Sequence, residues 1–152
     1  MGDQRFLNLC RYGDIEGVQA AIDNGTDANG LGWTGLMVAL HHSHNNVVQL
    51  LLNHPQIDVN KVDRDGECAL HCAVFRDNHE GIAALLARQD LTTVNQRPIV
   101  KAVRCKAVNC FNLLLSHPWV DLDTREDCQR SPEEVRRYFE KLLQLNVFLC
   151  AI

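Results

Sequence analysis

Three histidines within four positions, His41, His42 and His44, are the residues of this sequence best suited to metal chemistry. Imidazole is a common zinc ligand, and on a helix His41 and His44 would lie three residues apart on one face. A zinc site needs further ligands, and no carboxylate or cysteine stands at ligand spacing nearby. We therefore expect no metal here, and a metal-dependent or thiol enzyme using this His41/His42/His44 cluster is an alternative function.

The seven cysteines offer a second kind of chemistry. His71 and Cys72 are neighbours, but adjacent helical residues point about 100° apart and do not form a nucleophile–base pair. No CxxC pair, Gly-rich phosphate loop, G-x-S-x-G or H-E-x-x-H occurs in the chain. The odd count and the apolar positions of several cysteines indicate reduced thiols in a cytoplasmic or nuclear protein. We predict a protein that is not an enzyme and has no cofactor.

Composition narrows the classes of partner. The chain has 152 residues, 46% of them hydrophobic, which suits a single domain over residues 1–152. Its net charge of -4 argues against nucleic acid, because phosphate binding needs a basic face. No apolar run approaches the roughly 18 residues that would span a bilayer. The expected partner is therefore neither nucleic acid nor membrane.

A repeated pattern of apolar residues indicates the elements that position these side chains. One set of five positions recurs after a shift of 34 residues and again after a further 29. The three sets are Leu36, Ala39, Val48, Leu51 and Leu52; Leu70, Ala73, Ile82, Leu85 and Leu86; and Ile99, Ala102, Phe111, Leu114 and Leu115. A period near 33 is typical of a helical solenoid, in which each repeat packs only on its neighbours.

Two segments make this pattern specific. Residues 32–39 read GWTGLMVA, residues 66–73 read GECALHCA, and LLL at 50–52 is followed by IDVN at 57–60. These segments resemble the ankyrin-repeat pattern G-x-T-P-L-H-x-A and its L-L-L…A-D-V-N ending. The resemblance implies an all-α fold, an ankyrin-like solenoid of stacked helix-turn-helix repeats with short β-hairpin turns. Thr34 is expected to cap its helix through the hydroxyl.

The same resemblance divides the chain into repeats. We expect an N-terminal capping repeat at 4–29, repeats at 30–60, 61–95 and 96–123, and a C-terminal capping segment at 124–152. The spacings from Asn29 to Thr34 and from Asn95 to Pro98 are short. The hairpins before the second and fourth repeats are therefore predicted to be shortened or lost.

In this family the ends of the first helices and the hairpin tips line a concave surface, which implies a candidate binding site. The helix-end residues are Arg11, Tyr12, His41, His42, Phe75, Arg76, Arg104 and Cys105, and the hairpins add Trp33, Arg64, Asp65 and Glu67. Aromatic residues and arginine dominate binding hot spots. The alternative is that Tyr12 and Phe75 merely pack against the neighbouring repeat.

The resulting prediction is a non-catalytic protein–protein interaction module. Its partner is expected to be a protein or peptide, acidic or acidic-aromatic, and its role that of scaffold, adaptor or inhibitor. A structural spacer within a longer repeat array is a further alternative.

Asn60 carries one more expectation. With Leu52, Asp58 and Val59 it resembles the site at which an asparaginyl hydroxylase modifies ankyrin proteins. The other reading is structural, because an asparagine in this position organises the hairpin through side-chain to backbone hydrogen bonds.

Overall fold

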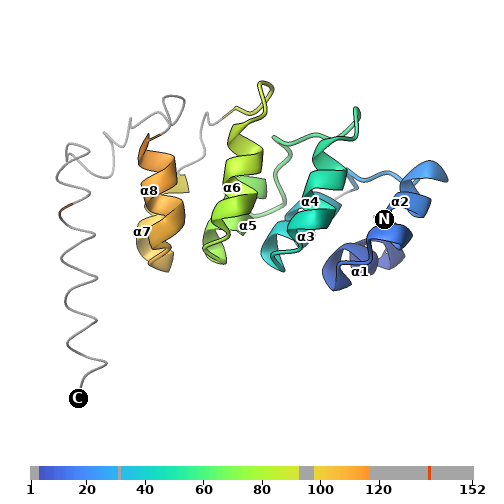
Figure 1. Ribbon diagram of the computed structural model, residues 1–152, viewed down its shortest axis with the longest axis horizontal. Coiled ribbons are helices and arrows are strands. Elements are labelled where there is room, and N and C mark those ends of the chain that lie inside the picture. Colours follow the sequence, from blue (N-terminus) through green and yellow to red (C-terminus); the bar gives the residue numbers. More distant parts are fainter. Residues whose placement is uncertain (1–3, 31, 93–97, 117–136, 138–152) are drawn as a thin grey trace, which may run out of the picture.

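The computed structural model describes residues 4–30, 32–92, 98–116 and 137, and this part of the chain forms eight α-helices. They are α1 (Gln4–Tyr12), α2 (Ile15–Asp23), α3 (Gly35–His41), α4 (Asn45–Leu52), α5 (Ala69–Phe75), α6 (His79–Leu86), α7 (Pro98–Cys105) and α8 (Val108–Ser116). Consecutive helices pair into hairpins, and the four hairpins stand side by side along the long axis (Figure 1). The expected all-α solenoid is confirmed.

Side-chain caps start several of these helices. The Thr34 hydroxyl accepts the Met37 N–H at 3.2 Å, as its position before α3 predicts. At the second helices, the Asp14 side chain accepts the Gly17 N–H before α2. The Asn78 side chain accepts the Gly81 N–H before α6 in the same way. Each cap satisfies a backbone donor that the first helical turn leaves without a partner.

One residue of left-handed backbone turns the chain between the two helices of every hairpin. These residues are Gly13, Ser43, Asp77 and Lys106, with φ of 72°, 58°, 50° and 58°. The same conformation at the same place gives all four hairpins one register. The residues just before each turn therefore occupy equivalent positions in the stack.

The first helices of the two middle hairpins, α3 and α5, are largely buried. α3 packs against α1, α4 and α5, and its residues 35–40 are all buried. The second helices are buried on one face only, so that in α4 Val48 is buried and Gln49 is exposed. The α6 backbone at Gly81 approaches the Leu40 side chain of α3 so closely that a Cβ atom at Gly81 would stand 2.5 Å from the Leu40 Cδ2 atom. One apolar core runs unbroken from Phe6 to Leu114.

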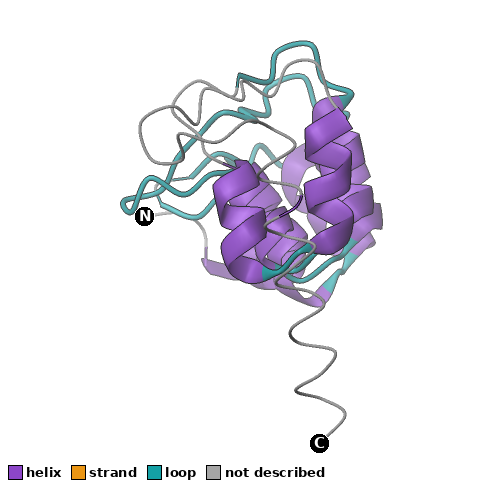
Figure 2. Cartoon of the chain, turned by 90° about the vertical axis from the view of Figure 1, so that its left-hand side faces the viewer, coloured by secondary structure: helices purple, strands orange, loops and turns teal. Residues whose placement is uncertain are grey.

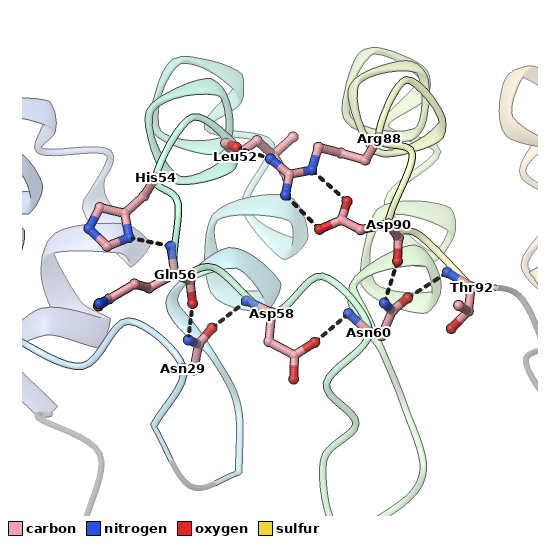
Figure 3. A network of polar contacts seen from close by, with 9 residues as sticks. All are labelled: Asn29, Leu52, His54, Gln56, Asp58, Asn60, Arg88, Asp90 and Thr92. Atoms are coloured by element: carbon pink, nitrogen blue, oxygen red, sulfur yellow. Dashed lines mark hydrogen bonds and ion pairs between the residues drawn. The ribbon is translucent and has the colours of Figure 1, made fainter.

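Hydrogen bonds join neighbouring hairpins on the side of the long loops. The Asn29 side chain donates to the Gln56 carbonyl at 2.6 Å and accepts the Asp58 N–H at 2.8 Å. Asn60 makes the equivalent pair of bonds to the following repeat (Figure 3). These loops gather along one side of the stack, above the helices in Figure 2.

A second set of bonds joins the hairpins on the side of the short turns. The His44 Nε2–H donates to the Arg11 carbonyl at 2.8 Å. The Asp77 carboxylate accepts the Cys110 N–H at 2.9 Å, again across one repeat. Because both ends of the helices are tied, the helix C-termini are held in a fixed row.

The predicted hairpin turn is present before α5. Val62 and Cys68 form an antiparallel bridge, and Asp63 donates its N–H to the Glu67 carbonyl at 2.9 Å. No other β-bridge occurs in residues 4–30, 32–92 and 98–116. The turn between Asn95 and Pro98 and the predicted capping segment 124–152, apart from residue 137, lie outside the described residues. Within the described part, no helix is both long and apolar enough to cross a bilayer.

Candidate functional site

The C-terminal ends of α1, α3, α5 and α7 form one row, which we call the helix-end surface. It comprises Arg11 and Tyr12, His41 and His42, Phe75 and Arg76, and Arg104 and Cys105. Each of these helices packs against the next, and the common turn gives them one register. Six of the eight side chains are exposed; His41 and Cys105 are partly buried. The structure therefore brings the predicted helix-end residues to one side of the molecule.

Aromatic rings connect two repeats within this surface. His41 is stacked on Phe75, with centroids 5.4 Å apart and an interplanar angle of 11°. Trp33 meets the His41 ring edge-on, with centroids 5.2 Å apart. Phe75 is nevertheless 52% exposed, Trp33 39% and Tyr12 76%. The rings thus pack on one another and still present apolar area to solvent, which is a recognised sign of an interaction site.

Positive charge surrounds the second imidazole of the row. Burial lowers the pKa of His42, and so does the charge of its cationic neighbours. These neighbours are Arg11, His44 and Arg76. The pKa of His41 is lowered first by burial and then by His42 and Arg76. Both histidines are consequently biased toward the neutral form in the free protein.

Arg11 and Arg76 have no carboxylate partner in the part of the chain that the structure describes. The partial negative charge at a helix C-terminus accounts for a cation at such a position. It does not account for the exposed rings of Tyr12, Trp33 and Phe75 beside those cations. The combination resembles the edge of a protein interface more than a solvated helix end.

The histidine cluster is not built as a metal site. α3 ends at His41, and Ser43 then takes a left-handed conformation, so His41 and His44 do not share a helix face as their spacing implied. The His44 ring instead forms a hydrogen bond with the Arg11 carbonyl, 33 residues earlier in the chain. Nothing in the sequence indicated this contact. Among the described residues, no three His, Cys, Asp or Glu side chains converge to hold an ion.

The buried cysteines are poorly suited to nucleophilic chemistry. Burial raises the pKa of the Cys72 thiol to about 12, and that of Cys10 to about 12. The Cys68 sulfur lies 3.6 Å from the His71 Nδ1 atom, but burial raises its pKa as well. Because the thiolate is the nucleophile, these protonated thiols act as small core residues.

Three of the four hairpin residues of the predicted site precede α5 and so lie at the opposite end of that helix from Phe75. Arg64 and Asp65 are at the turn before α5, whereas Phe75 ends that helix, and seven residues of helix span about 10 Å. Glu67 is used structurally, because it accepts from the Lys101 ammonium of the next repeat at 2.5 Å. Of the four hairpin residues predicted to bind a partner, only Trp33 reaches the helix-end rings.

The Asn60 carboxamide is occupied by the hairpin loops. Its Nδ2 donates to the Asp90 carbonyl at 2.6 Å, and its Oδ1 accepts the Thr92 N–H at 2.7 Å (Figure 3). Its own N–H donates to the Asp58 carboxylate at 3.0 Å. The structural role expected for this asparagine is therefore present, and hydroxylation remains a prediction.

Stacked helical hairpins with equivalent turns define a helical repeat protein, and sequence comparison identifies which one. A family model of ankyrin repeats in three copies matches residues 6–97, and the chain belongs to this family. The match covers α1 to α6 and stops at the start of α7. Ankyrin repeats are generally protein–protein interaction modules, and the family is generally non-enzymatic.

Curated relatives share about half of the chain. The human photoreceptor ankyrin repeat protein is 37% identical over 83 residues, which are 51% of this chain and 18% of that protein. Mouse and human Rabankyrin-5 are 32% and 33% identical over 81 residues, 51% of this chain and 7% of each protein. The chain thus spans only a small part of the length of these relatives.

Proposed function

We propose that this protein is a non-catalytic recognition module that binds a partner protein or peptide on its helix-end surface, as a scaffold, adaptor or inhibitor. The observation that carries the proposal is the exposed aromatic side chains of Tyr12, Trp33 and Phe75 on the same surface as two arginines. These arginines, Arg11 and Arg76, have no carboxylate partner among the described residues. Aromatic and arginine side chains supply most of the energy of protein interfaces. The reduced, buried thiols fit a cytoplasmic or nuclear protein.

The chemistry of the surface favours an acidic partner with aromatic residues. Arg11, Arg76 and Arg104 are exposed along the row, and a carboxylate accepts well from a guanidinium in bidentate geometry. The exposed rings next to them provide area for aromatic side chains, which pair with energies of about 0.5–1.5 kcal/mol beyond area burial.

Selection from a displayed library of short random peptides tests this function without a known partner. We expect wild-type protein to enrich peptides that contain Asp or Glu beside an aromatic residue. The test variant combines Arg76→Gln with Arg104→Gln. The matched control combines Gln49→Glu with Ala83→Glu at exposed positions of α4 and α6, and changes the net charge by the same amount.

The affinity of the enriched peptides decides the outcome. We expect it to fall about tenfold in the arginine variant, equivalent to ~1.4 kcal/mol, and less than about twofold in the control. Equal binding by wild type and arginine variant would show that the helix-end surface is not the site. Failure to enrich any peptide would reject the recognition function itself.

A further inference from the structure

His42 lies between two arginines that come from neighbouring repeats. Arg11 lies in the last turn of α1, and Arg76 is the C-cap of α5. α3, whose C-cap is His42, packs between those two helices. All three side chains are exposed. The site is therefore built from three neighbouring repeats.

The charged groups around His42 are all basic side chains. The groups that act on His42 are Arg11 from α1, His44 from the turn before α4, and Arg76 from α5. Those that act on His41 are His42 and Arg76. No described carboxylate offsets them at this point. A negatively charged group that bound at this point would be complementary to all of them.

We propose, on the basis of the function proposed above, that a carboxylate of the partner binds between Arg11, His42 and Arg76, and that the complex takes up a proton on His42. An acidic partner is then held more tightly as the pH falls. The aromatic residue beside that carboxylate packs on the rings of Trp33, His41 and Phe75. The His41 and His42 rings, 5.2 Å apart, join the two halves of this site.

The direction of the pH effect follows from linkage. In the free protein the pKa of His42 lies below its ordinary value of 6.5, because burial and neighbouring cations disfavour the imidazolium. A carboxylate in contact with the ring favours the imidazolium and raises the pKa. Between these two pKa values the complex binds more protons than the free protein, so affinity rises as the pH falls.

The size of the effect is limited by the pKa change. A rise of one pKa unit on binding strengthens the affinity by at most about tenfold, reached below the pKa of the free histidine. Below about pH 4.5 the partner carboxylate itself becomes protonated and the affinity decreases again. The useful window for measurement is therefore from about pH 7.5 to about pH 5.5.

A blocked synthetic peptide with a glutamate on each side of a tryptophan is the probe. Calorimetry measures its affinity and the number of protons taken up at both ends of this pH window. The same peptide with glutamines in place of the glutamates removes the carboxylates. The protein variants are His42→Gln, which keeps a polar group but does not titrate, and His54→Gln as a control on the long-loop side.

Wild type and His54→Gln are expected to bind the glutamate peptide about fivefold to tenfold more tightly at the lower pH, with proton uptake. For His42→Gln, the ratio between the affinities at the lower and the higher pH is expected to fall below about threefold. The glutamine peptide is expected to bind wild-type protein weakly at both pH values. The inference is overturned if wild-type protein binds the glutamate peptide equally well at the two pH values, or if His42→Gln keeps the wild-type ratio of affinities. In both cases the binding itself still supports the recognition function. Absence of binding at both values also overturns it, and the library selection then judges the recognition function separately.

Discussion

Replacing Asn60 with alanine tests how strongly the loop-side hydrogen bonds hold the repeats together. The substitution removes the bonds to the Asp90 carbonyl and the Thr92 N–H, at 2.6 and 2.7 Å. A hydrogen bond contributes about 1 kcal/mol net, so the two bonds predict a loss of about 2 kcal/mol. Asp90 and Thr92 are exposed, and water can replace the lost partner, which keeps the loss from being larger.

Urea unfolding followed by circular dichroism measures this loss directly. We expect a lower midpoint concentration of urea with an unchanged dependence of the unfolding free energy on urea. In thermal unfolding the midpoint temperature is expected to be lower by about 4–8 °C. Asn29→Ala removes the same two kinds of bond one repeat earlier and is expected to lose a similar amount.

Asn53→Ala is the matched control. Asn53 is exposed, its backbone is α-helical, and its side chain makes no hydrogen bond within the described part of the chain. We expect a change below about 0.5 kcal/mol for this variant. If Asn60→Ala unfolded with a free energy within about 0.5 kcal/mol of the control, the bonds in Figure 3 would not stabilise the stack and the reasoning would be wrong.

Four further outcomes are expected. The free protein should melt at lower temperature as the pH falls from about 7.5 to about 5.5, less so in His42→Gln, because the folded-state pKa of His42 is lowered and the unfolded chain binds more protons in that window. Ser43→Gly should raise the unfolding free energy by about 1 kcal/mol, since glycine adopts φ of 58° without strain; a lower midpoint in urea would contradict this. Cys72, with its pKa raised to about 12, should stay unalkylated by iodoacetamide until the protein unfolds, as peptide mapping will show. Protein from its native source should carry one added oxygen on Asn60 if the hydroxylase resemblance holds, and a spectrum of the intact mass without that species would exclude it.

The sequence predicted the repeating architecture because that architecture depends on local patterns. The apolar positions of α3 and α4 recur in α5 and α6, and their spacing is helical. Thr34 stands one residue before α3, where a hydroxyl caps the helix, and the structure confirms this. Such features involve residues within one or two turns of each other, so no knowledge of the neighbouring repeat is needed.

The candidate site was only partly predictable for the opposite reason. Register placed His41 and Phe75 at equivalent helix ends, but their stacking depends on how far adjacent repeats are rotated and on side-chain rotamers. Glu67 was predicted to bind a partner, yet its carboxylate accepts a hydrogen bond from Lys101, 34 residues later in the chain. These contacts join residues about one repeat apart, and apolar periodicity carries no information about which polar side chains will meet.

The periodic apolar positions of the sequence were enough to predict stacked helical hairpins of the ankyrin type, because such a face is buried when neighbouring hairpins pack on one another. Which polar side chains meet across the repeats became apparent only from the packed structure. It paired Glu67 with Lys101 and joined His44 to the Arg11 carbonyl, while the described part of the chain supplies no carboxylate to the Arg11 and Arg76 guanidinium groups. The physical reason is that side-chain partners across repeats are set by the spacing and rotation of whole hairpins, which the packed core establishes.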